Sequence, residues 1–282
     1  MIADFLITFR ETLEAALIVG IILAYLSKTK NTRYNNIVYT GIGAGLVASI
    51  IAAFLFTKVY GGFTGAAEEI FEGVAMLFGS FLITTVILWM MNQKNISHDL
   101  KEKVAKDIEH KNRTGLFLLT FISVLREGVE TVIFLGAASF VNGTNRLLGG
   151  ALGVAFAIFL GYLLFVASVR VDIKKFFNIS SLLLILFAAG LAAHGVHELQ
   201  EAHVLPTYIE HVWDINPPAP LADQGIYPPL HENGSVGSIA KGLFGYNGNP
   251  SLLEVLAYLV YIAVVFIIYK ALNLPDHLHI RK

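Results

Sequence analysis

Apolar residues along the chain gather into seven long stretches separated by polar connections. The stretches cover residues 4–27, 36–57, 68–91, 115–138, 147–168, 181–203 and 251–270. A helix needs about 20 predominantly apolar residues to cross a bilayer, so each stretch is long enough for one span. The pattern predicts an all-α polytopic membrane protein with seven transmembrane helices.

The composition agrees with this prediction and limits the chemistry. Of 282 residues, 55% are hydrophobic and 15% are charged, against roughly 25% charged in soluble domains. The net charge of −1 gives no indication of nucleic-acid binding. The chain has no cysteine, which excludes thiolate metal sites, so any metal must be bound by oxygen or nitrogen ligands.

The distribution of Lys and Arg predicts the orientation, because cytoplasmic loops are enriched in both. Fifteen lie in 28–35, 92–114, 169–180 and the segment after residue 269, whereas the opposite side carries only Lys58, Arg146 and Lys241. We therefore expect the N-terminus outside and the C-terminus inside. Residues 92–114 then form an inner loop and 204–250 a proline-rich outer loop.

Two halves of the chain resemble each other in pattern. Small residues recur every four positions in the second stretch, from Gly41 to Ala53, and in the fifth, from Gly149 to Gly161. Three spans followed by three more run in opposite directions, so the pattern predicts an inverted repeat. We expect one transmembrane domain made of repeat one (1–91), the inner loop (92–114), repeat two (115–203), the outer loop (204–250) and a last helix (251–270).

Two R-E-x-x-E runs lie inside the first and fourth stretches. The first is Arg10, Glu11 and Glu14, and the second is Arg126, Glu127 and Glu130. Charges at this depth cost roughly 3 kcal/mol each or more, and glutamates three apart share one helix face. Four carboxylates and two arginines would give a net charge of −2, which suits a cation. Alternatively, the arginines only neutralise the glutamates and the pairs hold helices together.

A second group of acidic and histidine residues lies near the predicted outer ends of the third and sixth stretches. We expect Glu72, His197, Glu198 and Glu201 to bind metal there, with Glu68, Glu69 and His194 as further candidates. Carboxylate and imidazole suit iron, manganese and zinc. Alternatively, Glu68 and Glu69 are solvated charges at a helix N-terminus.

With two R-E-x-x-E runs in the first and fourth of seven spans, the chain resembles the oxidase-dependent iron transporter family of fungal and bacterial iron permeases. The segment Gly242-Leu243-Phe244-Gly245-Tyr246 before the last stretch is also similar to that family's outer loop. The resemblance implies that Glu11, Glu14, Glu127 and Glu130 carry iron and that Arg10 and Arg126 balance their charge. It further implies a cytoplasmic-membrane permease supplied by a separate ferroxidase or periplasmic iron-delivery protein.

The combined interpretation is an iron permease, not an enzyme, with the iron ion as substrate and no further cofactor. Oxygen ligands without sulfur favour ferric over ferrous iron. The rivals are a transporter of another divalent metal such as manganese or lead, a membrane di-metal oxidoreductase and a proton-coupled carrier of an organic solute. The oxidoreductase is disfavoured because the Glu-x-x-His spacing of such sites is missing. The sequence does not reveal the oligomeric state.

Overall fold

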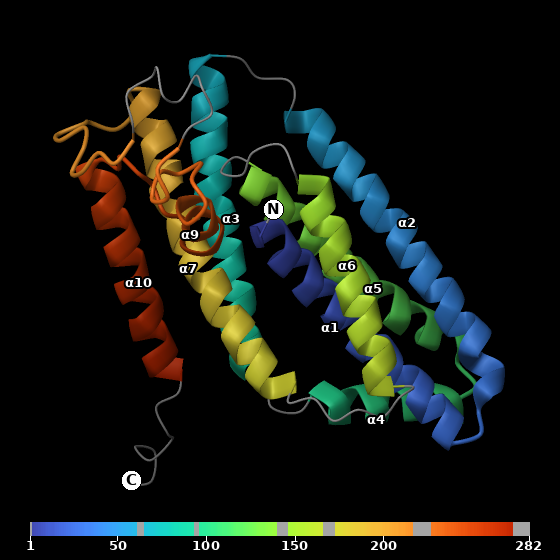
Figure 1. The fold of residues 1–282 in the computed structure, drawn as a ribbon. Helices are drawn as coiled ribbons and strands as arrows, with labels where there is room; N and C mark the ends of the chain where they lie inside the picture. The colour runs from blue at the N-terminus through green and yellow to red at the C-terminus, as the bar shows by residue number, and fades with distance from the viewer. Residues whose placement is uncertain are drawn as a thin grey trace, which may run out of the picture. The chain divides into compact units, whose positions relative to one another are not determined.

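The computed structural model describes residues 2–60, 65–92, 96–139, 146–165, 173–216 and 227–272. Within these residues the chain forms helices and no strand (Figure 1). The helices are α1 (Ile2–Lys28), η1 (Thr32–Tyr34), α2 (Asn35–Tyr60), α3 (Ala66–Asn92), α4 (Ile96–Glu109), α5 (Arg113–Ser139), α6 (Arg146–Phe165), α7 (Ile173–Glu201), α9 (Gly237–Phe244) and α10 (Leu252–Leu272). The predicted all-α architecture is confirmed.

Each of the seven apolar stretches is occupied by one long helix. By length and composition, α2, α3, α6, α7 and α10 could cross a membrane. Helices α1 and α5 are as long as α3, at 27 residues each, but they carry the charged R-E-x-x-E runs. Of the basic residues that predict the orientation, Lys94, Arg170, Arg281 and Lys282 lie outside the described residues.

The chain divides into two compact units. The first unit comprises Met1–Phe63 and Lys94–Ser180 and contains α1, α2, α4, α5 and α6. The second comprises Thr64–Gln93 and Ser181–Lys282 and contains α3, most of α7, α9 and α10. Both R-E-x-x-E runs therefore belong to the first unit, and the acidic and histidine group belongs to the second.

In the first unit, helices pair through small residues. Helix α1 packs mainly against α6 and α2 mainly against α5, and α1 also contacts α5 (Figure 1). A Cβ atom added at Gly45 of α2 would lie 3.0 Å from the Val124 Cβ, and one at Gly153 of α6 would lie 2.9 Å from the Phe9 backbone nitrogen. Small residues allow this close approach of helix backbones. The two predicted rows of small residues are thus contact surfaces.

Helix α4 packs against the ends of several helices of the first unit. Its Leu100 and Val104 are buried in one apolar cluster with Ile22 and Leu26 of α1 and Leu116 of α5. Its lysines at positions 101, 103 and 106 are exposed. The helix is therefore amphipathic, with its apolar side on the first unit.

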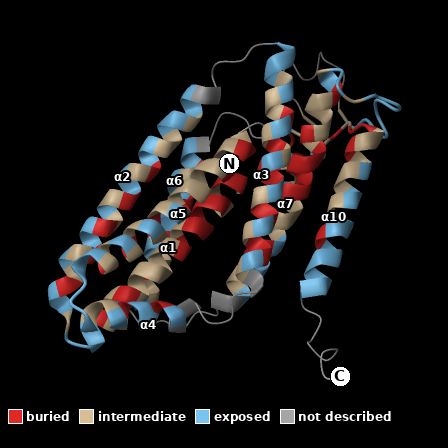
Figure 2. Cartoon of the chain, turned by 180° about the vertical axis from the view of Figure 1, so that it is seen from behind, coloured by how far each residue is buried: buried red, intermediate tan, exposed pale blue. Residues whose placement is uncertain are grey.

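In the second unit, α3 and α7 cross at two glycines. A Cβ atom on Gly73 or on Gly195 would lie 2.9 Å from the carbonyl oxygen of the other residue. Helix α10 contributes few buried positions: of its residues, Glu254 and Val265 are buried (Figure 2). The crossing brings the N-terminal part of α3 close to the C-terminal part of α7.

The proline-rich segment 204–250, predicted as an outer loop, contains a short helix, α9, that the sequence pattern did not predict. The helix ends at Phe244, and the next residue, Gly245, has a left-handed φ of 65°, a conformation that favours glycine. Its Lys241 donates to Glu232 at 2.7 Å. Burial alone would raise the pKa of Glu232, but the hydrogen bond and charge of Lys241 hold it below the ordinary value.

Replacing Gly45 by leucine should destabilise the first unit. The new side chain would press on Val124 and the backbone of α5, and overpacking typically costs about 1–3 kcal/mol. Gly43 lies on the same helix with nothing within 4 Å of an added Cβ, so Gly43→Leu is the matched control. We expect a lower thermal midpoint in detergent for Gly45→Leu alone; equal midpoints for the two variants would contradict the packing described above.

Candidate metal-binding site

In each R-E-x-x-E run the arginine forms ion pairs with both glutamates of the same run, an arrangement that we call the arginine fork. Arg10 donates to Glu11 and lies 2.9 Å from a Glu14 carboxylate oxygen, atom Nη2 to Oε1. The i+1 and i+4 positions bring the two carboxylates to one guanidinium, whose planar donors suit two acceptors. The spacing of the motif therefore sets this local geometry.

The second run repeats the fork on α5. Arg126 Nη2 lies 2.8 Å from Glu127 Oε1, and its Nε lies 3.2 Å from Glu130 Oε1. The surroundings differ, because Arg10 is 0% exposed whereas Arg126 is 41% exposed. The two motifs are alike in local geometry and unlike in burial.

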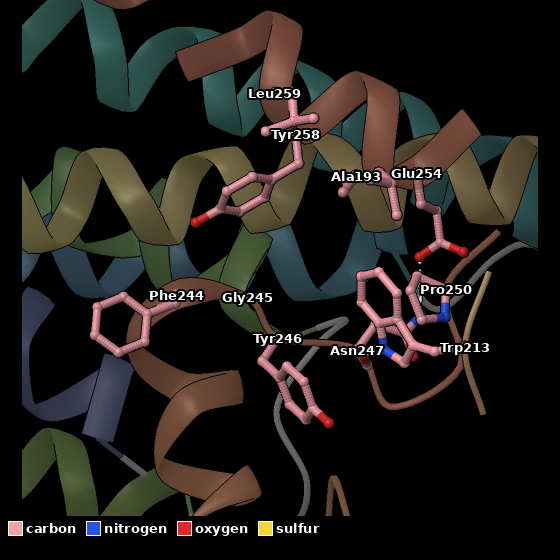
Figure 3. A pocket seen from close by; sticks show the side chains of 11 residues that line it. Ala193, Trp213, Phe244, Gly245, Tyr246, Asn247, Pro250, Glu254, Tyr258 and Leu259 are labelled. Atoms are coloured by element: carbon pink, nitrogen blue, oxygen red, sulfur yellow. Dashed lines mark hydrogen bonds between the residues drawn. The ribbon is translucent and has the colours of Figure 1, made fainter. Parts of the chain in front are cut away.

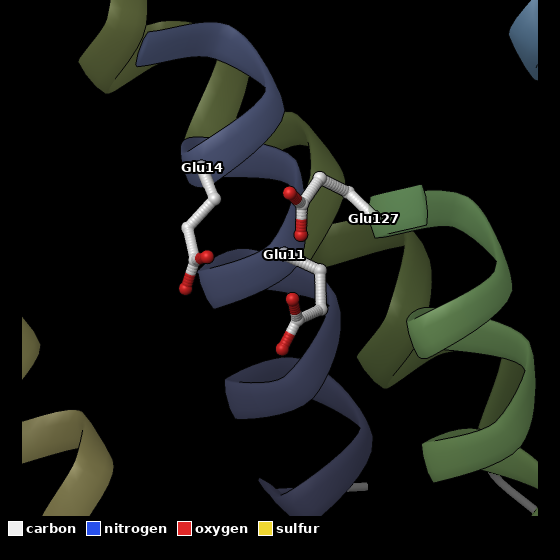
Figure 4. A group of neighbouring side chains, drawn as sticks. All are labelled: Glu11, Glu14 and Glu127. Carbon is white, nitrogen blue, oxygen red and sulfur yellow. The ribbon is translucent and has the colours of Figure 1, made fainter. Parts of the chain in front are cut away.

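Three of the four glutamates meet where α1 contacts α5. One carboxylate oxygen each from Glu11, Glu14 and Glu127 lies within 4.8 Å of the other two, and all three residues are buried (Figure 4). Glu130 is outside this trio, although it is close enough to interact electrostatically with Glu11 and Arg10. We refer to Glu11, Glu14 and Glu127 as the carboxylate trio.

The carboxylate trio has unused binding capacity. Within the trio, Glu11 and Glu127 each have one buried oxygen that accepts no hydrogen bond from any described residue, and so does Glu130 beside the trio. Burying a carboxylate is costly unless it is paired, and the two arginines offset only part of the charge of four glutamates. A cation between the carboxylates would supply the missing partner. Oxygen-only donors suit hard cations, and carboxylate-rich helical sites bind iron and manganese.

The third position of the second motif is fixed by packing. Gly128 lies directly against Ser49 of α2, and an added Cβ would collide with the Ser49 side chain. Thr12 occupies the equivalent position of the first motif. Glycine in the second motif is therefore explained by the approach of α2.

The second predicted group is brought together within the second unit. Glu198 of α7 interacts electrostatically with Glu69 and Glu72 of α3 and with its neighbours His197 and Glu201. These carboxylates lie just beyond the Gly73–Gly195 crossing. Glu68 is exposed, as expected of a solvated residue at the start of α3.

His194 does not share the surroundings of Glu198. Its Nδ1 lies 3.0 Å from the Gly190 carbonyl oxygen, and its charged neighbours are Lys241, Glu254 and Glu232. The sequence analysis named His194 as a further candidate for this group, but its charged neighbours differ from those of Glu198.

His197 contacts a carboxylate that the sequence analysis missed. Its Nδ1 lies 3.0 Å from Oε1 of Glu254, and its Nε2 lies 3.2 Å from Oε1 of Glu201. Glu254 was overlooked because the last apolar stretch was predicted only as a final transmembrane helix, with no candidate site residue in it. The available signal was the S-x-x-E spacing of Ser251 and Glu254, which is typical of a helix N-terminus.

Three carboxylates that converge inside an apolar helical protein could hold a cation, and comparison with known proteins gives the class. Residues 1–275 match the iron permease FTR1 family. The chain therefore belongs to this family of iron permeases. It is a multi-pass membrane protein whose family transports iron.

Named relatives are similar over nearly their whole length. The chain is 31% identical to the ferrous iron permease EfeU of Escherichia coli O6:H1 over 266 residues, or 93% of this chain and 92% of that protein. It is 29% identical to the ferrous iron permease EfeU of Yersinia pestis over 276 residues, 95% and 93% of the two chains. An uncharacterized protein of Archaeoglobus fulgidus is 32% identical over 269 residues, 94% and 93%. No solved structure matches the chain.

The carboxylate trio predicts unequal roles for neighbouring glutamates. Glu127→Gln should weaken Mn²⁺ binding to the purified protein by at least about tenfold, or 1.4 kcal/mol, because it removes one charged ligand of the trio. Glu130→Gln, one helical turn away, should have a smaller effect. Calorimetric titration of both variants in detergent tests this; equal losses would show that all four carboxylates bind together.

Proposed function

We propose that this chain moves iron across the cytoplasmic membrane into the cell through a site built from the two R-E-x-x-E motifs. The observation that carries the proposal is the carboxylate trio, in which buried oxygens from α1 and α5 converge without enough positive charge to balance them. Arg10 and Arg126 would lower the cost of the site when no ion occupies it.

We propose seven spans, with the N-terminus outside and the C-terminus inside. The five apolar helices support this number, and α1 and α5 join them because their charges are the transport site. The excess of Lys and Arg on one side supports the orientation. In the first unit, the first span (α1) packs against the fifth (α6), and the second span (α2) packs against the fourth (α5). A repeat that relates spans 1–3 to spans 4–6 converts one of these pairs into the other, so this packing supports the inverted repeat.

Two observations bear on the valence of the transported iron, and they favour different oxidation states. Carboxylates without sulfur or a close imidazole favour the harder ferric ion, which is our preference. The names of the bacterial relatives favour ferrous iron. Uptake of iron supplied either with a reductant or as a ferric chelate separates the two. Excess manganese or lead in the same assay tests the rival metals.

We propose that the second group, Glu72, His197, Glu198 and Glu201, captures iron at the outer mouth, with Glu69 beside it. A shared negative charge raises the local concentration of a cation. A separate ferroxidase or iron-delivery protein, which the family resemblance implies, would release iron at this side.

Glu14→Ala should abolish radioactive iron uptake into liposomes that contain the purified protein. The substitution removes one ligand of the carboxylate trio, and Glu14→Gln should be nearly as damaging because the charge also matters. Glu109→Ala, on the exposed part of α4, is the matched control and should transport normally. Near-normal uptake by Glu14→Ala would refute the proposed site.

Alanine at Glu72, Glu198 or Glu201 should raise the apparent KM for iron more than it lowers the maximal rate. The reason is that a capture group concentrates the ion without taking part in its passage. Initial uptake rates across a range of iron concentrations measure both constants. A lower maximal rate with unchanged KM would place these residues on the transport path instead.

A further inference from the structure

Glu254 is the first-turn carboxylate of α10 and is 1% exposed. Its Oε1 accepts from the Ser251 backbone N–H at 2.8 Å, and the Ser251 hydroxyl accepts from the Glu254 N–H at 3.2 Å. This reciprocal pair is a capping box. Oε2 accepts from the Asn247 side chain at 2.8 Å (Figure 3). Both oxygens thus act as acceptors in a fixed position.

The same Oε1 faces His197. Because Glu254 already accepts from two N–H donors, it is an acceptor toward His197 as well, so the Nδ1 atom at 3.0 Å carries the proton. The other ring nitrogen, Nε2, lies on the opposite side of the ring, 3.2 Å from Glu201 Oε1. At this distance a protonated Nε2 donates to Glu201, and a deprotonated Nε2 can share a cation with it. Exposure rises along this line, from 1% at Glu254 to 36% at His197 and 55% at Glu201.

This arrangement matches the way proteins orient a metal-binding histidine. Ligating imidazoles almost always donate their second N–H to a carboxylate or carbonyl, which fixes the ring and the tautomer. Here the buried carboxylate accepts from Nδ1 and Nε2 faces Glu201, while Glu198 interacts electrostatically with both His197 and Glu201 and also with Glu72. The His197 ring and the Glu201 carboxylate thus lie together on the more exposed side.

We propose that Glu254 is a positioning residue for iron capture, which holds His197 so that Nε2 and the Glu201 carboxylate take up the incoming ion together. This rests on the proposed capture function of the outer group. Glu254 itself is buried behind the ring and does not touch the ion. Helix α10, in which the sequence analysis named no site residue, thereby gains a role in transport.

A purely structural role is the alternative, because Glu254 also caps α10. The neighbouring contact between the Ser251 hydroxyl and Gln200 Oε1, at 2.7 Å, ties α10 to α7 without touching His197. Gln200→Leu is therefore the matched control: it removes a tie between the same two helices and leaves the His197–Glu254 pair in place.

The test measures iron uptake by Glu254→Leu, Glu254→Gln, His197→Ala, Gln200→Leu and the double variant of His197→Ala with Glu254→Leu. We expect Glu254→Leu to raise the apparent KM by about tenfold or more, the usual loss when such a partner is removed, with little change in maximal rate. Glu254→Gln should be close to wild type because its amide oxygen still accepts from Nδ1–H. Gln200→Leu should leave KM unchanged, and the double variant should be no worse than His197→Ala.

A spectroscopic readout remains valid if Glu254→Leu folds poorly. In protein labelled with ¹⁵N-histidine, the signals assigned with His197→Ala should show a proton fixed on Nδ1 in the wild type and in Glu254→Gln. Addition of Co²⁺, as a paramagnetic probe, should broaden the Nε2 signal first. A His197 ring with no preference for a proton on Nδ1 overturns the inference.

The outcomes separate this inference from the function on which it rests. If His197→Ala leaves KM unchanged, the outer group does not capture iron and the proposed capture function fails. If His197→Ala raises KM but Glu254→Leu does not, or if the two effects multiply in the double variant, capture stands and the positioning role of Glu254 is refuted.

Discussion

The burial of carboxylates in an apolar helix pair is the constraint on which the rest of the structure depends. Glu11, Glu14 and Glu127 are withdrawn from water, and a buried carboxylate is tolerated only with partners close by. Arg10 pairs with Glu11 and Glu14, and Arg126 pairs with Glu127 and with Glu130 beside the trio, but buried ion pairs rarely add stability over apolar packing. Fold stability alone therefore does not explain why α1 and α5 carry four glutamates and two arginines, whereas the proposed cation binding would explain it.

Packing determines where these charges meet. The small residues of α2 and α6 let those helices press closely on α5 and α1, and this fixes the positions of the motif-bearing helices. Gly128 shows the connection directly, since it belongs to the second motif and also receives Ser49 of α2. The geometry of the carboxylate trio is thus a consequence of helix spacing as much as of the motif.

The helices were predictable because apolar stretches of this length have one stable form in a bilayer, a helix with all backbone groups paired. The forks at Arg10 and Arg126 follow from i+1 and i+4 spacing alone. Helix α9 was missed because eight residues in a proline-rich loop carry too weak a periodic pattern. Glu254 was missed because its partner, His197, lies far away in the sequence and is reached only through the packing of α10 on α7.

The difference in burial between the two motifs could not be predicted from the sequence, because it also depends on how distant helices pack. Arg10 and Arg126 both have glutamates at positions i+1 and i+4, yet Arg10 is fully enclosed and Arg126 is not. An enclosed guanidinium has no water to replace a carboxylate that it loses, whereas a partly exposed one can exchange a carboxylate for water at lower cost. From this difference in exposure we infer that the ion pairs of the second motif open more easily than those of the first.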